Sequence, residues 1–439
     1  MKKIFMAIAA LLILGISASA QDGKSIYKKY SDMDGVEAVY ISPAMSRLIG
    51  RIPDINIGDD KVNLASLIKS MNGLYILNTS DPKIGDGIYS TAEKFVKKGQ
   101  YELLMEAKEN GEATRMFTVG TDKIVKGFVM LSKSGEDISF ISIDGEIERE
   151  KLEAAIAEIQ RLDALLSVSG EESDINAVNK FGKAKISEDT AHIIEKALEI
   201  SRATNGAFDI SIYPIMRLWG FTDSEYRVPQ KEELESELEH VGFEKPIFTQ
   251  DSLELGDAHG IDLGGIAKGF TSDRLMEVFD SYGMVSGCVS LGGNVQCYKR
   301  KTDGSLFRCG IAHPMYPDSS VYLGVVEVED RAVVTSGAYE RFFIDESSSK
   351  RYHHIIDPKT GYPAESGLSS TTIVSKSGML ADALSTACYV MGLEGSIEYW
   401  KEYGEDFDMI LMTDDGDIYV TAPLAQSFTS SFHVNIIGE

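Results

Sequence analysis

The stretch Ile261-Asp262-Leu263-Gly264-Gly265-Ile266-Ala267-Lys268-Gly269-Phe270 places a carboxylate and two glycines ahead of a run, 267–282, whose spacing predicts an amphipathic helix. Glycines there let a ligand's phosphates approach backbone N–H groups that the first helical turn leaves unpaired, and Lys268 adds a positive charge. The stretch predicts a site for a phosphorylated cofactor. A plain glycine turn before a helix is the alternative.

The first twenty residues predict export. Lys2 and Lys3 precede an apolar run over 4–16, and Ala18-Ser19-Ala20 comes just before Gln21, which is the pattern of a secretory signal over 1–20. No Cys follows the apolar run, so a lipid anchor is not expected. No later apolar run is long enough to span a bilayer. We therefore expect an exported, periplasmic protein without an integral membrane segment.

The charge balance bears on the partners. The chain has 68 acidic and 43 basic residues and a formal charge of −25, which argues against nucleic acid or anionic lipid as a partner. Its four cysteines lack CxxC spacing, so neither a zinc site nor a redox motif is predicted. Export permits a disulfide but the apolar content does not require one, and the sequence leaves the pairing open. The cysteines are Cys288, Cys297, Cys309 and Cys388.

The length and the periodic segments predict an α+β protein with two domains. After the signal over 1–20 we expect a small α+β accessory domain over 21–147, a larger α+β domain over 148–425 and a tail over 426–439. In the accessory domain we expect strands at 36–41, 73–77, 114–119, 127–131 and 137–143 and a helix at 88–108. In the larger domain we expect helices at 151–166, 188–204, 230–239, 268–282 and 379–391 and a last strand at 417–421.

Two further glycine-containing motifs can line a ligand pocket. Gly206-Ala207-Phe208-Asp209 follows the helix predicted at 188–204, and its aromatic and carboxylate side chains suit an aromatic ring; helix capping and core packing are the alternatives. Leu291-Gly292-Gly293-Asn294 follows an apolar strand, where paired glycines permit close approach to a ligand or equally mark a turn.

A third junction, Val333-Val334-Thr335-Ser336-Gly337, is followed by Tyr339-Glu340-Arg341. The Ser336 hydroxyl and the Arg341 guanidinium are groups that hold phosphate.

His353-His354-Ile355-Ile356-Asp357-Pro358 contains two adjacent histidines of the seven in the chain. In an extended segment adjacent side chains point to opposite sides, so only one of the two can face a site. A neutral imidazole placed there can take a proton from an attacking hydroxyl at neutral pH. A histidine packed against the following Asp-Pro turn is the alternative.

Asp382 and Thr386 stand four residues apart in an apolar helical run, so they lie on one helix face. A carboxylate in an apolar helix needs a partner, and a hard divalent cation would supply one. N-capping of the helix by Asp382 is the alternative.

Taken together, these motifs resemble one family. The blocks GAFDxSxxPxxxLWGF, DLGGIAKG, GGN, TSGxYER, HIIDPxTG and ADALST follow one another between Gly206 and Thr386. This order is similar to that of the FAD:protein FMN transferases, also called ApbE-like flavin transferases, over about 270 residues. The segment before it resembles a family of uncharacterised small secreted bacterial domains.

The resemblance implies a reaction and a set of site residues. It implies that FAD and Mg²⁺ bind, that a Ser or Thr hydroxyl of an acceptor protein attacks the FMN phosphorus, and that AMP leaves. It implies His354 as the base. The implied metal site is the carbonyl of Gly265 with Asp382 and Thr386. The implied cofactor-binding residues are Ala207, Phe208, Asp209, Asp262, Lys268, Gly292, Gly293, Asn294, Ser336, Gly337 and Arg341.

Two alternatives use the same pocket: a pyrophosphatase that gives FMN and AMP, and a flavin-binding protein without activity. The chain also departs from the family pattern at two points. No strand with the family's usual Met-Gly-Thr segment precedes Lys151, and Ser169 stands where an aromatic is usual. Family acceptors carry an Asp-Gly-x-Ser/Thr-Gly-Ala-Thr-like motif, which this chain lacks, so we expect the acceptor to be a different protein.

Overall fold

A computed structural model describes residues 23–33, 36–41, 71–79, 81–99, 101–109, 112–134, 137–170, 172–223, 225–249, 251–301, 304–316, 321–345 and 347–438. The expected signal segment lies outside these residues. The chain divides into two compact units. Unit 1 comprises Met1–Ile156, Val278–Gly292 and Cys297–Arg308, and unit 2 comprises Ala157–Glu277, Gly293–Gln296 and Cys309–Glu439. Both contain helices and strands, which confirms the α+β prediction.

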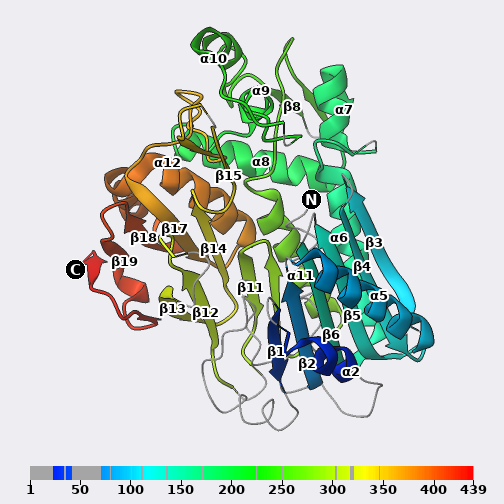
Figure 1. Ribbon diagram of the computed structural model, residues 1–439. Helices are drawn as coiled ribbons and strands as arrows, with labels where there is room; N and C mark the ends of the chain where they lie inside the picture. Colours follow the sequence, from blue (N-terminus) through cyan, green and yellow to red (C-terminus); the bar gives the residue numbers. More distant parts are fainter. Residues whose placement is uncertain are drawn as a thin grey trace. The chain divides into compact units, whose positions relative to one another are not determined.

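Unit 1 is built on an antiparallel sheet with the order β1-β2-β6-β5-β4-β3. Helices α2 and α5 contact each other and lie on the same side of the sheet (Figure 1). Alternating strand residues such as Val129 and Leu131 are buried against Ile88 and Ala92 of α5. The elements are α2 (Lys24–Tyr30), β1 (Glu37–Ile41), β2 (Met71–Thr79), α5 (Pro82–Lys98), β3 (Glu102–Glu109), β4 (Glu112–Gly120), β5 (Ile124–Ser134) and β6 (Asp137–Glu148).

The five strands predicted for this region are confirmed, but the helix predicted over 88–108 is wrong beyond Lys98. Asp81 caps α5 by accepting hydrogen bonds from the backbone N–H groups of Lys83 and Ile84, and the helix ends before Gly99. Residues 102–109 instead form β3, which pairs with β4. The Asn110-Gly111 dipeptide between the two strands is a hairpin signal that outweighs the helical spacing.

The helices predicted for the larger domain are confirmed in position, while the short helices α7 and α9 were not predicted. Gly392 interrupts α12 with a φ of 74°, so its first part ends close to the predicted end at Met391. The helices are α6 (Arg149–Leu166), α7 (Asp174–Phe181), α8 (Glu188–Ala203), α9 (Tyr213–Leu218), α10 (Lys231–Leu238), α11 (Ala267–Ser281) and α12 (Gly378–Tyr403).

A seven-stranded sheet has the order β10-β11-β14-β17-β18-β19-β21. Its strands are β10 (Gly287–Leu291), β11 (Asn294–Tyr298), β14 (Ala332–Gly337), β17 (Leu368–Ser375), β18 (Phe407–Thr413), β19 (Ile418–Thr421) and β21 (Val434–Ile437). The prediction that 417–421 is the last strand is wrong, because β21 pairs with β19 in parallel. Short apolar runs such as Val434–Ile437 give too weak a periodic signal to be recognised.

The smaller sheets are β12-β13-β20, β15-β16 and β7-β9-β8. Their strands are β7 (Lys183–Lys185), β8 (Ile247–Thr249), β9 (Ser252–Glu254), β12 (Phe307–Ala312), β13 (Tyr322–Val328), β15 (Phe342–Ile344), β16 (Arg351–His353) and β20 (Phe428–Thr429).

Helix α12 is the central element of unit 2. It contacts β14, β17 and β18 and lies across their face in Figure 1. Its buried residues Ala383, Leu384 and Cys388 join a core that includes Val334 of β14 and Ile373 of β17. In the part of the chain that the structure describes, none of the helices has the length and apolar character that a membrane span needs.

Candidate active site

The start of α11 and the start of α12 approach each other closely, because both carry a glycine at the contact. A Cβ on Gly269 would lie 2.1 Å from the carbonyl oxygen of Gly378, so no larger residue fits at position 269. This approach brings the backbone N–H of Gly269 within 2.9 Å of Asp382 Oδ2, to which it donates. Asp382 is only 3 % exposed. The glycines of the sequence motif therefore bring a buried carboxylate to the first turn of α11.

Helix α12 has its own cap, so the alternative that Asp382 caps the helix is wrong. The N-cap is Ser377, whose side chain accepts a hydrogen bond from the backbone N–H of Leu380. Asp273 of α11 adds a second cap, because its carboxylate accepts from the N–H groups of Gly378 at 2.7 Å and Met379 at 2.9 Å. Sequence reasoning missed Asp273, since a lone aspartate within an amphipathic helix carries no distinguishing signal.

Lys268 and Asp262 surround the glycine turn before α11. The Lys268 ammonium donates to the carbonyl of Gly264 at 2.9 Å and lies 3.4 Å from Asp382 Oδ1. Asp262 Oδ1 accepts the N–H of Gly264 at 2.6 Å. Burial raises the pKa of the Asp262 carboxyl, and the Gly264 N–H, Arg341 and Lys268 oppose that rise. The turn thus combines charged side chains with backbone groups, as the sequence predicted.

The three residues of the predicted metal site lie around this junction. A Cβ built on Gly265 would lie 3.7 Å from Thr386 Oγ1 and 3.1 Å from the ring of Phe208, so a side chain at position 265 would press against that ring. Asp382 lies one helical turn before Thr386. Among the described residues no group of three or more His, Cys, Asp or Glu side chains could hold a metal ion. A metal at this junction would therefore need hydroxyl or carbonyl oxygens beside the Asp382 carboxylate.

The segment after α8 is shaped by helix capping and core packing. Gly206 has a φ of 75°, and its N–H donates to the carbonyl of Ser201 at 2.8 Å, which confirms the capping alternative. Ala207 and Phe208 are buried, and Phe208 belongs to the main core of unit 2. Their predicted contact with a flavin ring stays a prediction.

Asp209 organises the loop in which it stands. Its Oδ1 accepts from the N–H and hydroxyl of Ser211, and its Oδ2 accepts the N–H of Phe243 at 2.9 Å. Burial raises the pKa of the Asp209 carboxyl, and these hydrogen bonds lower it. Both carboxylate oxygens are thus engaged inside the protein, and any contact with a cofactor would be additional to this role.

Gly292 and Gly293 form the two-residue turn between β10 and β11, with φ values of 57° and 87°. Both values suit the tight turns that fit the twist of a hairpin, so the turn alternative is confirmed. A Cβ on Gly293 would meet nothing within 4 Å, which leaves the turn open to a ligand. The next residue, Asn294, is 1 % exposed, and its amide nitrogen makes no hydrogen bond within the described protein.

The end of β14 is tied to α12. The Ser336 hydroxyl lies 2.7 Å from that of Ser385, which donates to the main-chain carbonyl of Asp382. Gly337 ends the strand, and a Cβ there would lie 2.4 Å from the ring of Tyr339. The Ser336 hydroxyl therefore helps to hold α12 in place, and its predicted contact with a phosphate is not tested.

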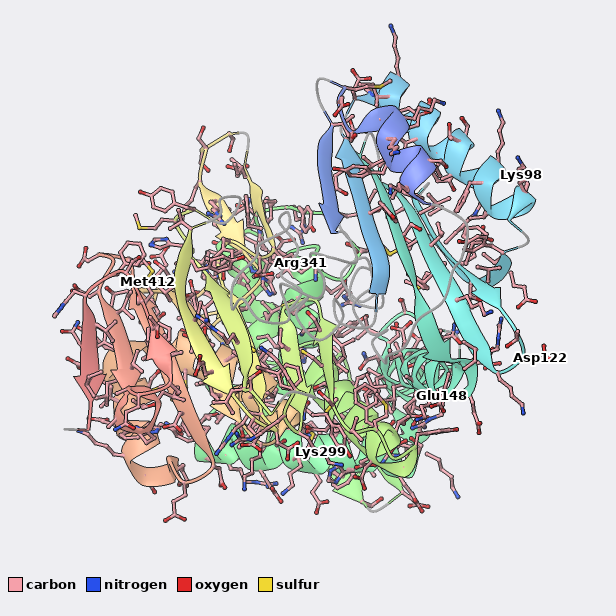
Figure 2. All side chains as sticks on the ribbon, turned by 90° about the horizontal axis from the view of Figure 1, so that it is seen from below. Lys98, Asp122, Glu148, Lys299, Arg341 and Met412 are labelled. Atoms are coloured by element: carbon pink, nitrogen blue, oxygen red, sulfur yellow. The ribbon has the colours of Figure 1, made fainter. Side chains whose placement is uncertain are left out.

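Arg341 contacts the aromatic residues that follow α9. Its guanidinium donates to the carbonyl of Phe221 and lies 5.6 Å from the centre of that residue's ring. Arg341 is labelled in Figure 2. A guanidinium with a protein carbonyl as a partner keeps further donors for a ligand.

The two adjacent histidines point in opposite directions, as predicted. His353 is 9 % exposed and packs edge-on against Tyr389 of α12, and burial lowers its pKa to about 4. His354 packs edge-on against Phe221, and its Nδ1 lies 3.0 Å from the carbonyl of Arg341. The Phe221 ring and the carbonyl of Arg341 thus contact the His354 ring, and its predicted role as a base stays a prediction.

A cavity of about 650 Å³ lies beside the capped start of α12. It is bounded by the starts of α8 and α12 and by the middle of α11. Two of the charged side chains in its wall form an ion pair, with Arg274 2.5 Å from Glu277. No predicted site residue lines it. The lining residues are Glu188, Asp189, His192, Phe270, Asp273, Arg274, Glu277, Lys376, Ser377 and Met379.

Comparison with known proteins decides the family. The model of the ApbE family matches residues 135–411, which is more than half of the chain. The chain belongs to the ApbE family. A second family model, described as a domain of unknown function (DUF4252), matches residues 30–155. The resemblance to the flavin transferases is thus confirmed, and the N-terminal region matches a domain of unknown function. The ApbE match begins at residue 135, shortly before β6 and ahead of the expected boundary at 148, and the two matches share residues 135–155.

Curated relatives align with more than half of this chain. The chain is 32 % identical over 272 residues to an FAD:protein FMN transferase of Treponema pallidum (57 % of this chain, 74 % of the relative). It is 31 % identical over 292 residues to one of Vibrio cholerae (64 % and 85 %). Among solved structures, the ApbE protein of Thermotoga maritima aligns with a TM-score of 0.60 at 28 % identity, covering 75 % of this chain and 99 % of that one.

Proposed function

We propose that this chain transfers FMN from FAD to a Ser or Thr hydroxyl of a separate acceptor protein, with Mg²⁺, and releases AMP. The curated relatives are FAD:protein FMN transferases, and the chain is an enzyme of this class, which uses FAD and acts on proteins. The metal, the acceptor hydroxyl and the release of AMP are our proposal, as are export and a periplasmic location.

The observation that carries the proposal is the contact between the starts of α11 and α12. It places the ammonium of Lys268 3.4 Å from the buried carboxylate of Asp382. Lys268 stands in the first turn of α11, where the unpaired backbone N–H groups of a helix favour anions. A dinucleotide pyrophosphate needs cationic groups and backbone donors. We assign the turn 262–265 and Lys268 to the pyrophosphate.

The oxygens at this contact suit a hard cation. The carboxylate of Asp382, the hydroxyl of Thr386 and the carbonyl of Gly265 belong to the ligand types that Mg²⁺ prefers. Thr386 and Gly265 are neighbours, and Asp382 is one turn away on the same helix. We assign these three residues to Mg²⁺, which when bound would neutralise charge on the phosphates. The ammonium of Lys268, 3.4 Å from Asp382 Oδ1, supports this assignment, because the carboxylate already lies beside a positive charge.

His354 has the hydrogen bond that a base requires. A carbonyl oxygen only accepts hydrogen bonds, so the contact of Nδ1 with the carbonyl of Arg341 places the imidazole proton on Nδ1. Nε2 then carries the lone pair that can take the proton of an attacking hydroxyl. The edge-on contact with Phe221 holds the ring in this orientation. We assign His354 as the general base for the acceptor hydroxyl.

The proposal is tested by incubating the mature chain with FAD, Mg²⁺ and an acceptor protein that carries an Asp-Gly-x-Thr-Gly-Ala-Thr segment. We expect the intact mass of the acceptor to increase by one FMN unit, and a Thr→Ala acceptor to remain unchanged. The mass of the chain itself should not change. An unmodified acceptor together with free FMN and AMP would instead identify a pyrophosphatase. An FMN adduct on the chain itself would contradict the separate acceptor.

A further inference from the structure

Two cysteine thiols of unit 1 face each other across the hairpin of β10 and β11. The sulfur atoms of Cys288 and Cys297 lie 3.7 Å apart. Strand β10 ends at Leu291 and β11 begins at Asn294, and the two are neighbours in the sheet. Each cysteine therefore stands three residues from the end of its strand at the two-glycine turn, and the two are cross-strand partners.

The backbone of such a pair suits a disulfide. Residues that face each other on antiparallel strands have Cα atoms about 4.5 to 5.5 Å apart, and disulfides span Cα distances of about 4.4 to 6.8 Å. The two sulfur atoms can reach bonding distance by rotation of their side chains. Cys297 is 1 % exposed, whereas Cys288 is only partly buried. An oxidant can therefore reach Cys288 first.

We propose that Cys288 and Cys297 form a disulfide when the protein meets a disulfide oxidant, either a small disulfide or the active-site disulfide of an exported thiol oxidoreductase. The Cys288 thiolate attacks one oxidant sulfur and releases the first oxidant thiolate. The Cys297 thiolate then attacks the Cys288 sulfur and releases the second. The chain loses two protons and two electrons, and the oxidant takes up the electrons. This proposal does not depend on the proposed transferase activity.

The other two cysteines provide internal controls. Cys388 is completely buried in α12, and burial raises its pKa to about 12. A thiol with so high a pKa has far less thiolate at neutral pH than an ordinary cysteine, so it reacts much more slowly in exchange. Cys309 is also buried, at 5 % exposed. Oxidation of the folded chain should therefore be confined to the hairpin pair.

Oxidation of the full mature chain with oxidised glutathione tests the proposal. The sample is quenched in acid, unfolded, alkylated with N-ethylmaleimide and digested with trypsin. No Lys or Arg lies between Leu275 and Tyr298, so the peptide over 275–299 carries both cysteines. We expect this peptide to lose two hydrogens and to take up no N-ethylmaleimide, while Cys309 and Cys388 are alkylated fully.

Two variants sharpen the test. In Cys297→Ser, we expect one glutathione to remain attached to Cys288, because the second exchange step is blocked. In Cys388→Ser, the hairpin disulfide should form as in the unchanged chain. Full alkylation of the 275–299 peptide after oxidation would overturn the proposal. A cross-link between this peptide and the peptide of Cys309 or Cys388 would overturn it equally.

Discussion

At the scale of residues, the carboxylate of Asp382 has two roles that a substitution can separate. It accepts the N–H of Gly269, which joins α12 to α11, and it supplies the only charged oxygen of the proposed Mg²⁺ site. Asparagine keeps an acceptor oxygen for the N–H but loses the charge.

We therefore predict that Asp382→Asn folds and melts nearly as the unchanged chain does, yet loses transfer activity by about 100-fold or more at low Mg²⁺. Loss of a residue that only hydrogen-bonds to a metal ligand typically costs about 10- to 100-fold, and Asp382 is proposed to bind the metal directly. The measurements are turnover against Mg²⁺ concentration and Mn²⁺ binding followed by electron paramagnetic resonance. Asp415→Asn, at an exposed turn, is the matched control. Unchanged turnover and Mn²⁺ affinity in Asp382→Asn would show that the metal assignment is wrong.

The adjacent histidines allow a catalytic role to be distinguished from a structural one by substitution. We predict that His354→Ala lowers the transfer rate by about 10² to 10⁴, the usual range for a lost general base, with a much smaller change in FAD affinity. His353→Ala should have little effect on the rate, because its side chain points into the core against Tyr389. Single-turnover rates and FAD titrations of both variants decide the matter. Equal losses of rate in the two variants would favour a structural role for the pair.

At the scale of elements, the packing of β16 against α12 predicts a dependence of stability on pH. His353, at the end of β16, is buried against α12, and burial lowers its pKa from its ordinary 6.5 to about 4. The folded protein therefore keeps this imidazole neutral in a range in which the unfolded chain takes up a proton. Stability should fall as the pH drops from about 6.5 to about 4, by ~3 kcal/mol from this residue.

The measurement is the free energy of unfolding in urea between pH 4 and 7. His353→Gln should show a smaller loss of stability on acidification, because glutamine does not titrate. His433→Gln, at an exposed position, should retain the full loss. If His353→Gln and the unchanged chain lost stability in parallel, the buried imidazole would not be the cause.

The elements also show what the sequence could and could not predict. The DLGGIAKG and ADALST blocks predicted two helix starts, because glycine pairs and a carboxylate in an apolar run are recognisable locally. The ligand-binding role of their residues stays a prediction. The contact between the two helix starts was not predictable, since it depends on Gly378 and on the Asp273 cap, which pair over more than a hundred residues of chain. The helix expected to continue past Lys98 failed because β3 forms only through its pairing with β4.

At the scale of the whole molecule, the N-terminal unit also contains segments from later in the chain. Unit 1 contains residues up to Ile156 and two later segments, Val278–Gly292 and Cys297–Arg308, which lie within the ApbE match. Strand β6 ends at Glu148 and α6 begins at Arg149, with no linker between them. A direct junction of this kind favours a region that folds with the rest of the enzyme.

We predict that a truncated chain starting at Gly145 melts about 5 °C or more below a chain starting at Gln21, since it lacks most of the sheet of unit 1, and that it binds FAD more weakly. Thermal melts and FAD titrations of the two proteins are the measurements. An unchanged melting temperature together with unchanged affinity would make the N-terminal region an independent module.

The most direct test of the central claim is the ratio of covalently bound flavin to AMP. The mature chain is incubated with FAD, Mg²⁺ and the acceptor protein, and acceptor-bound FMN and free AMP are quantified in the same sample over time. Transfer to a protein hydroxyl predicts that both increase together in equal molar amounts and that neither forms when the acceptor lacks its Ser or Thr. AMP that accumulates at the same rate without the acceptor hydroxyl would contradict the account, because water would then be the acceptor.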